Sequence, residues 1–301
     1  MEESPRTNES TRREFLKNAG VIAGASAAAL TVGASLTYGT PVATAAAATP
    51  RNDTVRMVQD LQRALTRPLA SRRWGMVIDP RRCIGCHACT VACIAQNGLP
   101  VGVSYRTVPE VESGTFPSLE RFFMPANCMQ CENAPCIKAA NAVVKGSMAR
   151  RADGIVTIDY KRMKGRKVFK AADKACPYDH ALYYDAGRSW TSGTPAIQPY
   201  DKRGSHEYGV TWSRAKTQGA TRKCHFCTER IDAGLLPACV ATCTGQAMHF
   251  GDLRDSASLV AELMAATTTL RIEKGASTSP RVIYIDDPLA GSAMTCSTCH
   301  G

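Results

Sequence analysis

Cysteine dominates the chemistry that this chain of 301 residues could perform. Twelve of its fourteen cysteines fall into four groups between residues 83 and 243. The groups are 83–93 with C-x2-C-x2-C-x3-C, 128–136 with C-x2-C-x4-C, Cys176 alone before a proline, and 224–243 with C-x2-C, eleven further residues and C-x3-C. Thiolates repeated at such short intervals are typical of metal ligands.

The triplet spacing favours cubane iron–sulfur clusters. A C-x2-C-x2-C loop can hold three corners of one cubane, while the next cysteine, three residues on, lies on a helix that faces away and ligates the neighbouring cluster. Zinc is the competing interpretation, but zinc takes four ligands in two pairs, and each triplet here leaves a fourth cysteine over. A disulfide-rich secreted scaffold is what the cysteine count alone would suggest.

Under this crossing rule, each cluster takes three cysteines from one motif and the fourth from its partner motif. The first group then pairs with the fourth, and the second group pairs with the lone cysteine. The three predicted ligand sets are Cys83, Cys86, Cys89 and Cys243; Cys224, Cys227, Cys239 and Cys93; and Cys128, Cys131, Cys136 and Cys176.

A fourth cluster is predicted to be absent. Its ligands would stand at positions 166, 169, 172 and 140, where the chain has Arg166, Phe169, Ala172 and Ala140. All four ligands of one site are replaced and the twelve others are present, so one entire cluster has been removed around Cys176. Three oxidised cubanes would contribute about −6 against the formal charge of +11.

The C-terminus carries a different cysteine motif. Cys296, Cys299 and His300 form C-x-x-C-H, the attachment motif for c-type haem, in which two thioethers hold the porphyrin and the histidine ligates iron. The same pattern occurs inside the first cysteine group, so the motif alone does not decide, and a disulfide or two free thiols are the alternatives. A sixth ligand would come from Met294, from His249 or from another subunit.

Short strands and one amphipathic helix are predicted to position these ligands. Residues 75–79, 154–159 and 281–286 have the β-branched and apolar composition of short strands. Residues 54–65 predict a helix, which we expect to pack on a neighbouring surface. Its expected apolar face is Val55, Val58, Leu61 and Leu65.

The N-terminus has the pattern of a Tat export signal. Arg12-Arg13 precedes Phe15-Leu16-Lys17, an Ala/Gly-rich stretch covers 19–36, and small residues follow at 43–45. We therefore expect a periplasmic protein exported after folding. Gly, Ser and Thr make 24–35 too polar for a membrane helix. Since no basic helix or RNA-binding motif accompanies the positive charge, no nucleic-acid partner is predicted.

In order, the motif stretches resemble the iron–sulfur electron-transfer subunits of molybdopterin oxidoreductases related to dimethyl sulfoxide reductase. Most members of that group carry four clusters, and the three-cluster pattern is similar to the small subunit of pyrogallol–phloroglucinol transhydroxylase. The export signal favours respiration over transhydroxylase chemistry. The resembling stretches are WGMVIDPRRCIGCHACTVAC (74–93), NCMQCENAPC (127–136), ACPYDHALYY (175–184), RKCHFCTERIDAGLLPACVATC (222–243) and GQAMHFGDL (245–253).

The resemblance implies an α+β fold of two ferredoxin-like domains, one inserted in the other and loop-rich around the clusters. Its expected parts are a signal peptide (1–45), an N-terminal helix and linker (46–73), a two-cluster domain (74–105 and 215–285), an inserted one-cluster domain (106–185), a surface loop (186–214) and a C-terminal tail (286–301).

The function implied is electron transfer without catalysis. The chain would relay electrons between a molybdopterin catalytic subunit and a quinone- or cytochrome-linked partner, either a membrane anchor subunit or a c-type cytochrome. The alternative is a subunit that assembles and docks a multihaem cytochrome conduit; a colourless, disulfide-bonded binding module is a third possibility. The cations expected beside the clusters are Arg81, Arg82, Arg222 and Lys223.

Overall fold

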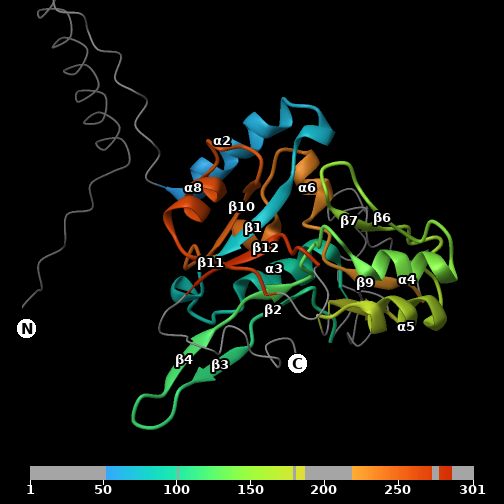
Figure 1. The fold of residues 1–301 in the computed structure, drawn as a ribbon, viewed down its shortest axis with the longest axis horizontal. Coiled ribbons are helices and arrows are strands. Elements are labelled where there is room, and N and C mark those ends of the chain that lie inside the picture. Colours follow the sequence, from blue (N-terminus) through green and yellow to red (C-terminus); the bar gives the residue numbers. More distant parts are fainter. Residues whose placement is uncertain (1–51, 100–101, 179–180, 187–218, 273–277, 287–301) are drawn as a thin grey trace, which may run out of the picture. The chain divides into compact units, whose positions relative to one another are not determined.

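The computed structural model describes residues 52–99, 102–178, 181–186, 219–272 and 278–286 (Figure 1). All of them belong to one compact unit, Thr49–Gly301. The predicted export signal, the surface loop beyond residue 186 and the C-terminal C-x-x-C-H motif lie outside the described residues.

A four-stranded sheet forms the centre of this unit, in the order β10-β1-β12-β11 (Figure 1). Strand β1 (Trp74–Ile78) pairs antiparallel with β10 (Met248–Asp252) and parallel with β12 (Val282–Ile285), and β11 (Thr269–Leu270) extends the far edge. Every residue of β1, β10 and β12 is buried. Burial on both faces explains why β1 and β12 are almost continuously apolar, whereas β10 also contains the buried polar residues His249 and Asp252.

The three predicted strands are confirmed as β1, β7 (Val156–Ile158) and β12. The remaining strands make two-stranded sheets around the central one, pairing β2 with β5, β3 with β4, β6 with β7 and β8 with β9. Their bounds are β2 Arg106–Thr107, β3 Glu110–Ser113, β4 Glu120–Phe123, β5 Ala126–Asn127, β6 Met148–Arg150, β8 Leu182–Tyr184 and β9 Thr221–Lys223.

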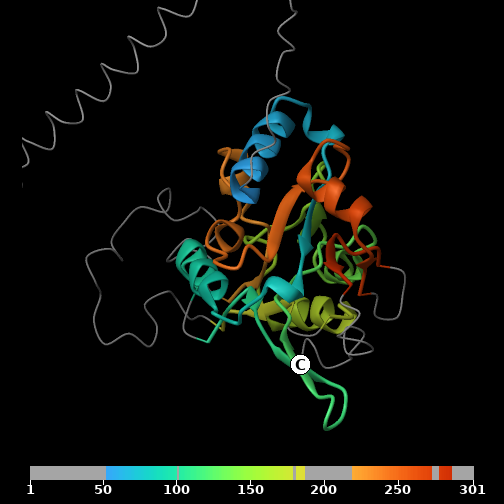
Figure 2. The same cartoon turned by 90° about the vertical axis from the view of Figure 1, so that its left-hand side faces the viewer.

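Short helices connect the strands (Figure 2), and four of the twelve cysteines lie within them, namely Cys89, Cys93, Cys136 and Cys239. The α-helices after α2 are α3 Ala88–Asn97, α4 Pro135–Val143, α5 Arg166–Ala175, α6 Thr228–Asp232, α7 Ala238–Ala241 and α8 Leu259–Ala266, with 3-10 turns at Leu69–Ser71 and Pro80–Arg82. Among the described residues, none of the helices has the length and apolar character needed to cross a bilayer.

The fold is mixed α and β with small sheets, which is compatible with the predicted α+β class. The central sheet uses segments of the predicted two-cluster domain, whereas α4 and α5 come from the predicted inserted domain. The ferredoxin-like arrangement of the two domains stays a prediction.

Helix α2 (Asp53–Leu65) is the predicted N-terminal helix, and it packs on β10 and α8 as expected. The predicted apolar face was wrong at one position, because Val55 is 46% exposed. The buried face instead follows the i, i+4, i+7 spacing of one helix side from Met57 through Leu61 to Ala64, and it includes Asp60.

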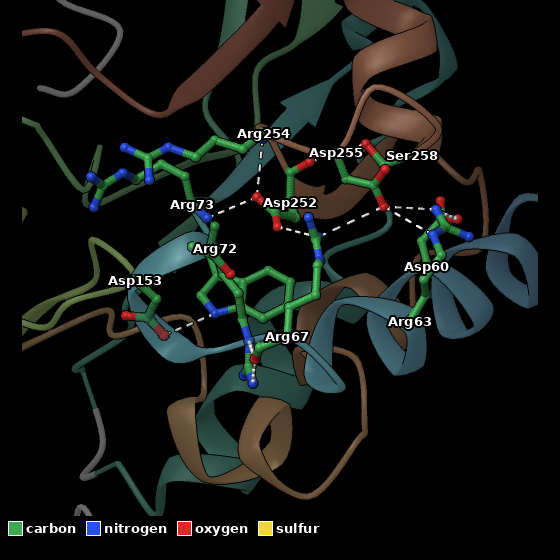
Figure 3. A network of polar contacts seen from close by, with 12 residues as sticks. Asp60, Arg63, Arg67, Arg72, Arg73, Asp153, Asp252, Arg254, Asp255 and Ser258 are labelled. Carbon is green, nitrogen blue, oxygen red and sulfur yellow. Dashed lines mark hydrogen bonds and ion pairs between the residues drawn. The ribbon is translucent and has the colours of Figure 1, made fainter.

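Burial of the Asp60 carboxylate is explained by the polar network that joins α2 to the segment before α8 (Figure 3). Its Oδ2 accepts a hydrogen bond from the Leu259 amide at 2.7 Å, at the first turn of α8. Arg63 donates from Nη2 both to Asp60, at 2.7 Å, and to Asp255, at 2.8 Å. The network continues through Arg67, Arg73 and Asp252.

Replacing this acceptor should weaken the attachment of α8. We expect Asp60→Ala to lower the free energy of unfolding by about 1–3 kcal/mol, because the buried Leu259 amide loses its partner. Asp60→Asn keeps an acceptor oxygen and should lose less. Urea unfolding of anaerobically prepared protein, followed by circular dichroism, measures the free energy of unfolding of both variants. Equal losses of stability in the two variants would show that the carboxylate charge opposite Arg63 matters and that the hydrogen bond to the Leu259 amide does not.

Candidate metal centres

The twelve cysteines of the four groups all lie in the described residues, and each is a free thiol. No three Cys, His, Asp or Glu side chains of those residues stand close enough together to hold a single metal ion. The thiols gather instead at three places, each of which draws on two of the cysteine groups. We name them site 1 (Cys83, Cys86, Cys89, Cys243), site 2 (Cys93, Cys224, Cys227, Cys239) and site 3 (Cys128, Cys131, Cys136, Cys176).

Site 1 surrounds a small cavity that all four of its cysteines line. Cys243, far along the chain, follows α7, and its Sγ accepts a hydrogen bond from the Ala247 amide at 3.2 Å. Cys86 is exposed, with Thr244 Oγ1 3.3 Å from its Sγ. Site 1 therefore reaches the protein surface.

Two glycines allow the loops of site 1 to close. Gly85 has φ +67°, and a Cβ there would lie 2.6 Å from the Phe123 ring. Both the backbone conformation and the lack of space therefore require glycine at this position. A Cβ at Gly245 would overlap the carbonyl oxygen of Arg82. The segment after Cys243 can pass this close to the first cysteine loop only without a side chain.

Site 2 surrounds a second small cavity, lined by all four of its cysteines. Helix α3 carries Cys93 into it, one turn beyond Cys89 of site 1. Asn97 Nδ2 donates to Cys93 Sγ at 3.6 Å, and Asn127 Nδ2 donates to Cys224 Sγ at 3.5 Å. Hydrogen bonds of this kind to ligand sulfurs tune an iron–sulfur cluster.

The same backbone turn recurs at the first C-x2-C of each of the three cysteine groups that contain this spacing. The residue before the second cysteine is left-handed in each: Gly85 at φ +67°, Gln130 at +50° and Phe226 at +57°. This conformation is strained for a side chain such as Phe226 and persists where the surroundings impose it. Its amide donates to Cys224 Sγ at 3.5 Å, so the turn directs N–H groups toward sulfur.

Gln130 tolerates the left-handed conformation because its buried side chain is fully engaged. Its Nε2 donates to the Cys224 carbonyl at 2.7 Å, and its Oε1 accepts from the Val156 amide at 2.8 Å. The first bond joins the loop of site 3 to the first cysteine of the fourth group, in site 2, and the second joins it to β7. Nothing in the sequence pattern indicated this role.

Site 3 joins the second cysteine group to Cys176, which is the C-cap of α5. Burial raises the pKa of Cys176, and the neighbouring thiols Cys128, Cys136 and Cys131 raise it further. Burial likewise raises the pKa of Cys131 to about 12, again with the thiols of Cys128 and Cys136 adding to the effect. Because the other three thiols all raise the pKa of Cys176, the four thiols of site 3 lie close together.

The four positions at which a fourth cluster would need cysteines lie in packed helices. Helices α4 and α5 lie against each other. Two of the four replaced positions, Ala140 and Ala172, are 0% exposed, and Phe169 packs on the Tyr184 ring with centroids 5.5 Å apart. The fourth, Arg166, lies over the same ring at 5.1 Å. Small and aromatic side chains thus occupy the interface where the predicted ligands are lacking.

Site 1 adjoins site 2, and site 2 adjoins site 3. Burial raises the pKa of Cys89, Arg106 opposes the rise, and Cys239 of site 2 adds to it. Burial also raises the pKa of Cys224 to about 11, and the next contribution comes from Cys128 of site 3. The geometry agrees: Cys89 and Cys93 lie one turn apart on α3, and Asn127 Nδ2 donates both to Cys224 Sγ and to the Cys128 carbonyl, so site 2 lies between the other two.

The four predicted cations have different surroundings. Arg82 lines site 1, whereas Arg81 pairs with Asp79 at 2.8 Å. Arg222 is buried in an ion pair with Asp185 at 3.1 Å. Lys223 is 1% exposed and donates to the carbonyl of Cys224. Its charge partly offsets the burial that raises the pKa of Cys136 and Cys224.

The sequence-based prediction missed Arg106, which lines site 2 and donates from Nη2 to Cys239 Sγ at 3.7 Å. It stands thirteen positions after Cys93, so proximity along the chain gave no signal. The predicted sixth haem ligand His249 is 1% exposed, with Nε2 3.2 Å from Asp53 Oδ2.

Sites built in this way define an iron–sulfur protein, and a 4Fe-4S dicluster domain matches residues 119–197 and 203–253. That span includes the whole of site 3 and three of the four cysteines of site 2.

Similar proteins extend the match. A selenate reductase component of Mesobacillus selenatarsenatis is 41% identical over 94% of this chain and 99% of its own length. The arsenate respiratory reductase iron–sulfur subunit of a Shewanella species is 31% identical over 71% of this chain and 96% of its own length. A tetrathionate reductase component of Salmonella typhimurium is 35% identical over 74% of this chain and 78% of its own length. The chain belongs to the iron–sulfur subunits of the molybdopterin oxidoreductase family.

The close approach at Gly245 generates a prediction. We expect Gly245→Ala to push the Arg82 segment away and to cost about four irons per chain, the content of one cubane. Ala241→Ser, an exposed substitution two residues before Cys243, is the matched control and should keep its iron. Iron and acid-labile sulfide per chain measure both variants, and full iron in Gly245→Ala would contradict the assignment of Cys243 to site 1.

Proposed function

We propose that the chain carries three [4Fe–4S] clusters, held by the cysteines of sites 1, 2 and 3. One observation supports this most strongly: Cys93 of the first group lines the cavity of the fourth group, and Cys243 of the fourth group lines that of the first. Such exchange of the last cysteine is the ligation pattern of paired cubanes. The buried guanidinium beside site 2, which lacks a carboxylate partner among the described residues, also fits an anionic group.

Three clusters are proposed instead of four because α4 and α5 fill the remaining position. Ala140 and Ala172 are fully buried at that interface. A cubane there would need four ligands that the chain lacks and space that the two helices occupy.

The proposed function is electron relay without catalysis. Each cluster takes up and releases one electron at a time. The chain's own residues hold the sites in a row, direct N–H groups at the sulfurs and supply buried positive charge. Site 1, with its exposed Cys86, is where the row reaches solvent among the described residues.

The proposed partners are a molybdopterin catalytic subunit and a quinone- or cytochrome-linked protein, either a membrane anchor or a c-type cytochrome. The relatives support this, since their names are those of subunits of reductase complexes. Selenate, arsenate and tetrathionate, the oxyanions in those names, are the first oxidants to present to the assembled complex.

The proposed location is the periplasm, reached through the Tat signal at Arg12-Arg13. Tat export carries folded proteins, so the clusters would be inserted before the chain meets an oxidising compartment. Brown protein in the periplasmic fraction would support this, and its retention in the cytoplasm would contradict it.

A specific pattern favours a second candidate function. The C-terminal Cys296, Cys299 and His300 match a c-type haem site, which would make the chain a docking subunit of a multihaem conduit. His249 is a poor sixth ligand, because its ring is buried against Asp53.

Removing one ligand should remove one cluster. We expect about twelve irons per wild-type chain and about eight in Cys176→Ala, because a cubane needs its fourth thiolate. Electron paramagnetic resonance of the reduced proteins should show the signals of sites 1 and 2 unchanged. About sixteen irons in the wild type, or no loss in the variant, would contradict the assignment.

The haem hypothesis has a separate readout. If the terminal motif binds haem, reduced wild-type protein will show a sharp α-band that survives denaturation, and Cys299→Ala will lose covalent attachment. The same variant should keep its cluster iron, which makes it the control for Cys176→Ala. A wild-type spectrum without the band would leave the terminal cysteines without this role.

A further inference from the structure

Arg106 is a buried cation without an anionic partner in the described part of the chain. Its side chain begins on β2 and is 1% exposed. Nη2 donates to Met76 Sδ at 3.0 Å and to Cys239 Sγ at 3.7 Å, while Nε and Nη1 contact no acceptor. Two of the three guanidinium nitrogens are therefore buried without a partner.

This is unusual because an unpaired buried charge is strongly unfavourable. The other buried arginines of the described residues have oxygen acceptors. Arg222 pairs with Asp185, Arg281 pairs with Glu132, and Arg72 donates to the carbonyls of Leu65 and Arg67. A guanidinium with two buried nitrogens that meet neither a carboxylate nor a carbonyl implies that another anion completes its surroundings.

The surroundings of Arg106 identify that anion. Nη2 lies 3.7 Å from Cys239 Sγ of site 2. On the other side β2 packs on α3, where Thr90, next to Cys89 of site 1, donates from Oγ1 to the Arg106 carbonyl at 3.1 Å. The thiols of Cys239, Cys89 and Cys224 also act electrostatically on Arg106, so its guanidinium lies where sites 1 and 2 adjoin. Once their sulfurs are cluster ligands, both neighbours of Arg106 are negatively charged.

We propose that Arg106 is the shared counter-charge of the clusters at sites 1 and 2 and raises both of their reduction potentials. The inference rests on the proposed function. Reduction adds one negative charge to a cluster, and a fixed cation nearby stabilises the reduced form more than the oxidised form. Arg106 keeps its charge at every accessible pH, so the effect does not depend on titration.

Site 3 provides an internal reference. Lys223 adjoins it, near Cys136, and donates to the carbonyls of Val156 and Cys224 at 2.6 and 2.5 Å. Loss of the Arg106 charge leaves Lys223 in place. The potential of site 3 should then stay near its wild-type value while those of sites 1 and 2 fall.

The test is an anaerobic redox titration of the cluster-loaded protein, followed by electron paramagnetic resonance, in Arg106→Gln and Arg106→Lys. Signals are assigned to site 3 by their loss in Cys176→Ala. We expect Arg106→Gln to lower the reduced-to-oxidised ratio of sites 1 and 2 about tenfold at the wild-type midpoints, a shift of about 59 mV. Arg106→Lys should stay near wild type. Arg121→Gln, which removes an exposed arginine on β4, is the control and should change nothing.

Unchanged potentials in Arg106→Gln, or equal shifts at all three sites, would overturn the proposal. If Arg106→Gln fails to bind iron, the Arg106→Lys variant distinguishes the two roles of the side chain. Full iron content with wild-type potentials in Arg106→Lys supports the counter-charge role. Loss of iron in both variants shows that Arg106 is needed for packing instead. The iron content of the wild type tests the proposed function separately, because it does not depend on Arg106.

Discussion

One turn of helix α3 separates Cys89 from Cys93, and the relative positions of sites 1 and 2 depend on that spacing. Residues four apart lie one above the other on a helix, about 6 Å along its axis. The first cysteine lines site 1 and the second lines site 2, so neither site is complete without the partner motif. The central sheet supports this exchange, because its strands β1 and β10 join the segments that lead into the first cysteine group and out of the fourth.

Charge is the second constraint on the fold. A low-dielectric interior disfavours ionised thiols, and burial accordingly raises the pKa of most of the twelve cysteines. The chain compensates with amide N–H groups, asparagine side chains and two buried cations. Arg106 and Lys223 occupy the two junctions between adjacent sites, and neither forms an ion pair with a carboxylate of the described residues. An apolar core in these places would be simpler to fold, so the charges are better explained by anionic clusters.

Much of this could be predicted from the sequence, because ligand spacing is a local property. The exchange of Cys93 and Cys243 between motifs, the strands at β1, β7 and β12, and the packing of α2 all followed from spacing and periodicity. Arg106 and Gln130 could not be predicted, since each acts on a cysteine distant in the chain. Val55 was wrongly placed in the core because periodicity alone could not reveal that Asp60 would be buried to cap α8.

The central claim is that three clusters lie in a row, with their ligands exchanged between motifs. Crystallography of anaerobic protein with data collected at the iron absorption edge tests it most directly. The account predicts three groups of iron peaks in the order of sites 1, 2 and 3, with Cys243 bound at site 1 and Cys93 at site 2. A fourth group of peaks between α4 and α5, or any cluster bound only by the cysteines of one motif, would contradict it.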